Sequence, residues 1–168
     1  MTTHLGHAIG ILLDDEPRHG TASVRIETAG RTPTEWAVEF TKPGTWSADN
    51  GTERWVCDRE TLAVTSRGGI REERPIRHGW VHKALQPFFA AAAPIWGRRG
   101  DDWRLLEGPR LEEGMLIVGV ESLKPPGHSG RLIIHPEEGF IAAMLLPGHE
   151  VTVTEFDSRP PDPAGSRR

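Results

Sequence analysis

The chain of 168 residues has the length of one domain with a full hydrophobic core, and its net charge of −4 gives no electrostatic basis for binding nucleic acid. The single cysteine, Cys57, excludes an internal disulfide and a CxxC metal or redox site. The N-terminal segment lacks both the basic start and the long apolar run of a signal peptide, so we expect a cytoplasmic protein without a transmembrane segment.

The first predicted element is an amphipathic helix over residues 4–14. Its apolar residues recur at the spacing of one helix face, at Leu5, Ala8, Ile9, Leu12 and Leu13. Pro17 and Gly20 end this pattern. Residues 21–28 (TASVRIET) then alternate between apolar and polar side chains, which predicts a strand with one buried face.

Residues 35–66 predict a meander of antiparallel strands rich in tryptophan. Trp36, Val38 and Phe40 alternate with polar or small residues, so they share one face of a strand. Turns are predicted at residues 42–44 (Lys-Pro-Gly) and at 50–51 (Asn-Gly). Two further strands follow, RWVCD and TLAVT, and the neighbours of Cys57 indicate that it is a small buried residue of the first.

A polar loop over residues 67–78 precedes the best helical candidate after the first, residues 79–97. Its apolar residues fit one broad stripe, although Pro87 favours a short first turn, a kink and a helix that restarts at Pro87. After Trp103 the chain returns to predicted strands near residues 105–106, 115–123, 131–135, 140–146 and 151–156. We expect a single domain over residues 1–157 and a disordered tail over 158–168, because the tail lacks apolar side chains that could pack.

Catalytic and metal-binding signatures are weak in this chain. His78 and His82 have the spacing of two metal ligands on one helix face, but no third ligand is fixed by the pattern. No G-x-S-x-G nucleophile motif is present, and the paired acids lie beside predicted turns. We therefore predict a protein that is not an enzyme and binds neither metal nor cofactor, and keep a metal-dependent enzyme as the weakest alternative.

Six tryptophans are the other unusual feature of the sequence. They fall on predicted strands, on the predicted second helix and on its flanks. An ordinary aromatic core is one interpretation, and an apolar cavity between sheet and helix, walled by aromatic rings, is the other. The alanines beside Phe88 and Phe89 favour the cavity slightly, because small side chains leave space against a concave sheet.

Several segments resemble the lipoprotein-localisation carrier (LolA-like) family. The similarity is carried by the AIGILLDD helix leading into TASVRIE, the FTKPGTWSAD run, the RWVCDRETLAVTS hairpin and the segment RLIIHPEEGFIAAMLLPGHEVTVTEFD. It extends from about residue 4 to residue 157. Two positions depart from the family pattern: Arg59 stands where glycine is usual, and His135 replaces the aspartate before Pro136. No export signal or lipid-attachment cysteine is visible.

The resemblance implies an α+β, mainly β fold: a curved antiparallel half-barrel sheet with an N-terminal helix and a helical lid. It implies a non-enzymatic carrier that holds a hydrophobic small molecule or acyl chain between sheet and lid. Arginines near the lid, at 71, 74 and 77, could meet an anionic head group or be solvated. The predicted ligand-binding residues are Trp36, Val38, Phe40, Trp55, Val81, Leu85, Phe88, Phe89, Ala92 and Trp96. The alternative is a protein-interaction or sensor module with a filled core and a protein partner.

Overall fold

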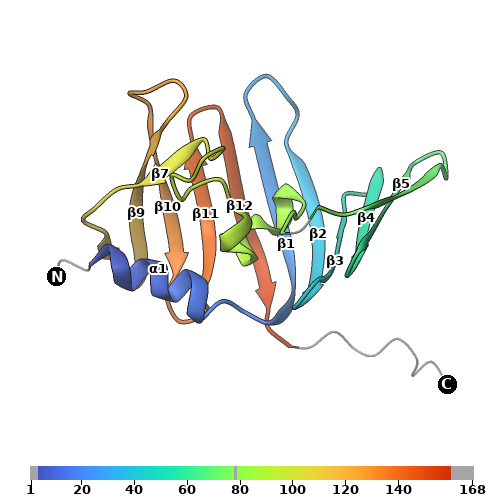
Figure 1. The fold of residues 1–168 in the computed structure, drawn as a ribbon, viewed down its shortest axis with the longest axis horizontal. Coiled ribbons are helices and arrows are strands. Elements are labelled where there is room, and N and C mark those ends of the chain that lie inside the picture. Colours follow the sequence, from blue (N-terminus) through green and yellow to red (C-terminus); the bar gives the residue numbers. More distant parts are fainter. Residues whose placement is uncertain (1–3, 78, 160–168) are drawn as a thin grey trace.

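One antiparallel sheet of twelve strands dominates the computed structural model, which describes residues 4–77 and 79–159. The helix α1 (Leu5–Asp14) and two short 3₁₀ helices, η1 (Lys83–Phe88) and η2 (Ala90–Ala92), lie on one face of this sheet (Figure 1). The strands are β1 (His19–Thr28), β2 (Thr34–Thr41), β3 (Thr45–Asp49), β4 (Glu53–Asp58), β5 (Thr61–Ser66), β6 (Arg71–Pro75), β7 (Trp103–Leu105), β8 (Arg110–Glu112), β9 (Met115–Ser122), β10 (Ser129–His135), β11 (Phe140–Leu146) and β12 (His149–Asp157).

The sheet joins the two halves of the chain through one long-range pairing. Its strand order is β6-β5-β4-β3-β2-β1-β12-β11-β10-β9-β7, and β8 also pairs with β9. Each half is a meander of neighbouring hairpins, and the antiparallel contact between β1 and β12 unites them. The mainly β class, the first helix and the antiparallel meanders predicted from the sequence are confirmed.

The predicted half-barrel and its helical lid are wrong. The sheet stays open across the molecule (Figure 1), and β6 and β7 stand at the two ends of its strand order. The segment predicted as the lid forms only η1 and η2. Pro87 lies inside η1, lacks a backbone N–H and disfavours a continuous α-helix, and Pro94 follows only a few residues later. The short stretch between these prolines cannot stabilise an α-helix of ordinary length.

Two edge strands lie outside the strands predicted from the sequence. β6 forms in the predicted loop 67–78 and pairs with β5, while β8 pairs with β9. All five residues of β6 and all three of β8 are exposed, so neither strand carries the alternation that marks a buried face.

The core lies between the sheet and the elements that cover one face. Cross-strand neighbours on this face include Val24 with Trp36 and Phe40 with Trp46. Leu12 of α1 and Leu85 and Phe88 of η1 are buried against them. The covering elements therefore fill most of the space that a carrier would leave for its ligand.

Candidate functional site

An apolar cleft lies between the sheet and the crossing segment, which we define as residues 76–77 and 79–97. It lies where this segment passes the β2–β3 turn, β3 and β4, and it has a volume of about 470 Å³. That volume lies within the range of small-molecule sites. Its apolar lining consists of Pro43, Trp46, Cys57, Ile76, Trp80, Val81, Phe89, Ala91 and Ala92, and its charged lining of Glu16, Lys42, Arg59 and Arg77.

Aromatic rings hold the start of the crossing segment against the sheet. The ring of Trp80 lies 5.9 Å from the rings of both Trp46 and Trp55. The ring of His82 lies 4.3 Å from that of Trp36 and 5.1 Å from that of Trp55. Trp80 is nevertheless 40% exposed. It therefore forms part of the cleft wall that both solvent and a ligand can reach.

A half-buried ion pair closes the end of the cleft next to α1. Lys42 Nζ lies 2.9 Å from a carboxylate oxygen of Glu16 and donates a hydrogen bond to the carbonyl oxygen of Phe88. It also lies 4.6 Å from the ring centre of Phe89, a cation–π distance. Burial lowers the pKa of Lys42, while Glu16 opposes that shift. The pair links the end of α1, β2 and the crossing segment.

Cys57 contributes an unreactive thiol to the cleft. Its side chain is 1% exposed, and Sγ donates to the carbonyl oxygen of Gly44 at 3.5 Å. Burial, with a smaller effect of the Asp58 charge, raises the pKa of this thiol, so it stays protonated and is a poor nucleophile. The sequence prediction of a small buried residue in a strand is confirmed.

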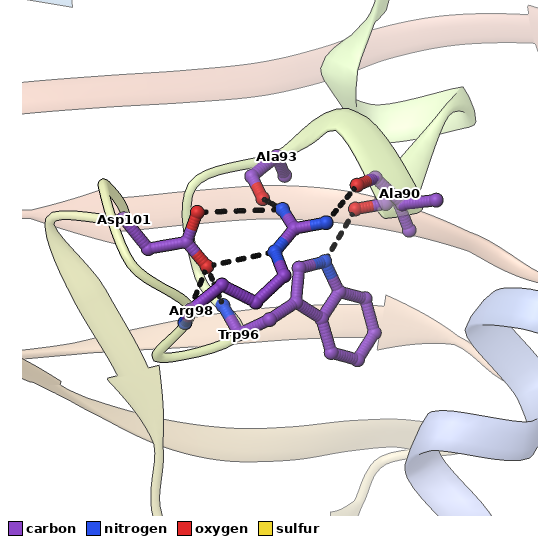
Figure 2. A network of polar contacts seen from close by, with 6 residues as sticks. Ala90, Ala93, Trp96, Arg98 and Asp101 are labelled. Atoms are coloured by element: carbon purple, nitrogen blue, oxygen red, sulfur yellow. Dashed lines mark hydrogen bonds and ion pairs between the residues drawn. The ribbon is translucent and has the colours of Figure 1, made fainter. Parts of the chain in front are cut away.

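The far end of the crossing segment is fixed by a polar clasp, formed by Trp96, Arg98 and Asp101 (Figure 2). The Arg98 guanidinium donates to the carbonyl oxygens of Ala91 and Ala93 and pairs with Asp101, with Nε 3.1 Å from Oδ2. Asp101 also accepts from the backbone N–H groups of Trp96 and Arg98, and Trp96 Nε1 donates to the carbonyl oxygen of Ala90. These bonds satisfy main-chain carbonyls that a helix would have paired internally.

His82 is a buried neutral side chain, not a metal ligand in any cluster that the structure describes. Its ring is 5% exposed, and Nδ1 accepts from the N–H of Ala84 at the start of η1. Burial, with a smaller effect of the Lys83 charge, lowers the pKa of His82 to about 4. Residues 4–77 and 79–159 contain no group of three or more metal-binding side chains. His78, the other half of the predicted pair, lies outside the described residues.

The predicted ligand-binding residues divide between the cleft and the core. Val81, Phe89 and Ala92 line the cleft. Trp36, Val38, Phe40, Leu85 and Phe88 are buried in the core, with 3% exposure or less. Trp55 packs against His82 and Trp80 beside the cleft, and Trp96 belongs to the clasp.

Sequence reasoning missed several residues of the cleft. Trp46 and Cys57 lie opposite each other on β3 and β4, and strand alternation could have placed both on the same face as Phe40. No local pattern marks Glu16 or Lys42, because the contact between them depends on how α1 packs against the β2–β3 turn. Trp80 is one of the six tryptophans noted in the sequence, but no local pattern indicates that its ring stays exposed in the cleft wall.

No helix in the described part of the chain is long and apolar enough to cross a membrane. Comparison with protein-family models and with curated proteins gives no match. Solved structures do resemble the chain. One is the crystal structure of MucB, with a TM-score of 0.49 and 14% identity over 96% of this chain and 62% of that one. Another is MucB in complex with MucA(peri), with a TM-score of 0.47 and 15% identity over 96% of this chain and 60% of that one.

The chain thus spans less than two thirds of the length of these two structures. The resemblance to lipoprotein-localisation carriers stays a prediction from the sequence.

Proposed function

We propose that the protein is a non-enzymatic binding protein for a hydrophobic small molecule or acyl chain, and that the ligand occupies the cleft under the crossing segment. The observation that carries this proposal is the apolar lining of a cavity of about 470 Å³ that side chains leave unfilled. Ligand sites are typically concave and lined mostly by apolar side chains, so an apolar cleft of this size supports a ligand.

The energetics of the cleft favour an apolar chain with a polar end. Each buried CH₂ group contributes roughly 0.8 kcal/mol to binding. Trp46, Val81 and Phe89 offer apolar contact surface, while Arg59 and Arg77 are exposed at the rim. A ligand can therefore bury its chain and keep its head near these charges. Of the arginines suggested from the sequence, Arg77 lines the cleft, whereas Arg71 lies on β6 and pairs with Glu73.

Filling the cleft tests the proposal. A long-chain fatty acid carrying a fluorescent group should bind the native protein with saturable, one-to-one stoichiometry. Ala92→Trp places bulk in the cleft and should weaken binding at least tenfold with little change in the melting temperature, because a void accepts volume that a packed core does not. Ala29→Trp, at an exposed turn, is the matched control and should bind normally.

Two results would refute the cleft as a ligand site. One is the absence of any probe binding by the native protein. The other is an Ala92→Trp variant that binds the probe normally yet is destabilised by roughly 1–3 kcal/mol, as expected for overpacking of a filled core.

A protein-interaction or sensor module is the second candidate function. The observation that favours it is the open edge of the sheet at β6, where the backbone of Arg71–Pro75 pairs with β5 on one side only. Exposed strand edges can add a strand from a partner. Native mass spectrometry before and after organic extraction separates the two functions, because only a carrier loses mass on extraction.

A further inference from the structure

A second cavity lies on the other side of the crossing segment and shares no lining residue with the cleft. It has a volume of about 520 Å³ and is bounded by η1, residues 94–95 and 102–103, the β9–β10 loop and the β11–β12 turn. Neither the sequence motifs nor the proposed carrier function involves it. The residues that decide its chemistry are Lys83, Lys124, His149, Asp102, Trp103 and Leu146.

Basic side chains from three distant parts of the chain line this cavity: Lys83, Lys124 and His149. Lys83 and Lys124 are two of the only three lysines in the sequence. Within the described residues, the lysine that forms an ion pair is Lys42, not either of these. One acid, Asp102, also lines the cavity. With His149 neutral, the lining carries a net charge of about +1 in a protein whose net charge is −4.

His149 lines the cavity and experiences the positive charge of Lys83. Its Nδ1 lies 3.2 Å from the hydroxyl oxygen of Thr28, so Nε2 is the ring nitrogen left for another partner. Burial lowers the pKa of His149, and the positive charge of Lys83 lowers it further. A negative charge in the cavity would therefore relieve the repulsion between these groups.

The rest of the lining is mainly apolar, with Gln86 as a further polar side chain. Trp103 and Leu146 are half-buried and offer apolar surface, whereas Ile95 and Met144 are 0% and 2% exposed. An inorganic ion would leave this surface uncovered, whereas an aromatic ring or short alkyl chain could pack on it. The net charge of about +1 on the cavity lining matches a ligand with one negative charge.

We propose that this cavity binds a small organic anion, a monocarboxylate whose carboxylate lies among Lys83, Lys124 and His149 and whose apolar body packs on Trp103 and Leu146. The site is independent of the acyl-chain site, because the two cavities have no residue in common.

The test uses the full chain, a panel of aryl and short alkyl monocarboxylates such as phenylacetate, and their neutral amides. Calorimetry should detect saturable binding of at least one carboxylate, with its amide at least tenfold weaker. Lys83→Gln/Lys124→Gln should lose tenfold or more in affinity. Arg71→Gln/Arg110→Gln removes the same charge from exposed edge strands and should bind normally. Ala92→Trp should also bind normally, which separates this site from the cleft.

Proton NMR titration of His149 supplies a readout that a structural role of the lysines would not give. The pKa of His149 should rise when the carboxylate binds, and it should also rise in ligand-free Lys83→Gln. The proposal fails if no carboxylate of the panel binds at millimolar concentration, if acid and amide bind equally, or if the double lysine variant keeps its affinity. It also fails if the carboxylate binds without moving the pKa of His149.

Discussion

At the scale of single residues, His82 couples the stability of the fold to pH. Its pKa falls from 6.5 to about 4 on folding, so the unfolded chain binds the proton more readily between these values. The contribution of the neutral His82 ring to the free energy of unfolding is fully present above pH 6.5 and is lost as pH falls toward 4. The shift corresponds to on the order of 3 kcal/mol. The free energy of unfolding, measured with denaturant at pH 7 and at pH 4.5, should fall less between these two values in His82→Asn than in the native protein.

Asparagine is chosen for this test because it can still accept the hydrogen bond from the Ala84 N–H but cannot titrate. His128→Asn, at an exposed position of the β9–β10 loop, is the control and should lose as much stability as the native protein. An unchanged pH dependence in His82→Asn would show that the buried ring is not the group responsible.

Gly139 is a second position where one residue decides the local structure. It lies in the β10–β11 turn with a φ of +69°, and an added Cβ would overlap the carbonyl oxygen of Asp15. Gly30 has a φ of +74° with open space around it. Both alanine substitutions incur the backbone penalty of about 1–2 kcal/mol. Gly139→Ala should cost roughly 1–3 kcal/mol more in unfolding free energy, since α1 must move. Equal losses would contradict this steric account.

At the scale of elements, the crossing segment depends on its clasp. Burial alone would raise the pKa of Asp101, but hydrogen bonds from Arg98 outweigh it and bring the pKa below the ordinary 3.8. The clasp therefore stabilises the fold above pH 3.8 and weakens as pH falls below that value. Arg98→Ala should cost about 1–3 kcal/mol by denaturant unfolding, since it removes the charged partner of the buried Asp101 carboxylate and leaves the carbonyl groups of Ala91 and Ala93 without their side-chain donor.

Hydrogen exchange can show whether the stability lost in Arg98→Ala is lost from the crossing segment. The amides of Ala92 and Ala93, which bond to carbonyl oxygens within the segment, should exchange faster in Arg98→Ala. Arg98→Lys should recover only part of the protection, because an ammonium group cannot reproduce the planar fork of guanidinium. Arg99→Ala removes the neighbouring exposed arginine and should change neither measurement. Protection that stays native in Arg98→Ala would argue against the clasp.

At the scale of the whole molecule, β12 joins two meanders into one sheet. It pairs with β1 on one side and β11 on the other, and it contributes the fully buried Val151. A chain ending at Leu146 should lose cooperative unfolding, measured by circular dichroism, because two interior strands become edges and the core opens. A chain ending at Arg159 is the control, and we expect it to melt like the full-length protein. Cooperative unfolding of the shorter chain would mean that the two meanders fold separately.

The sequence by itself determined the elements whose patterns are local. The apolar spacing from Leu5 to Leu13 predicted α1, and the alternation of Trp36, Val38 and Phe40 predicted a strand with one buried face. Glycine and proline positions predicted most turns between them. These signals are readable because each depends on neighbours within a few residues.

Tertiary structure alone decided the edges, the crossing segment and the cleft. β6 and β8 are strands only because β5 and β9 offer them partners. Phe88 and Phe89 are adjacent and chemically identical, yet Phe88 is fully buried in the core and Phe89 lines the cleft. Their difference arises from how the chain turns between η1 and η2 over the sheet. Residues distant in sequence fix that turn, so no local pattern can encode it.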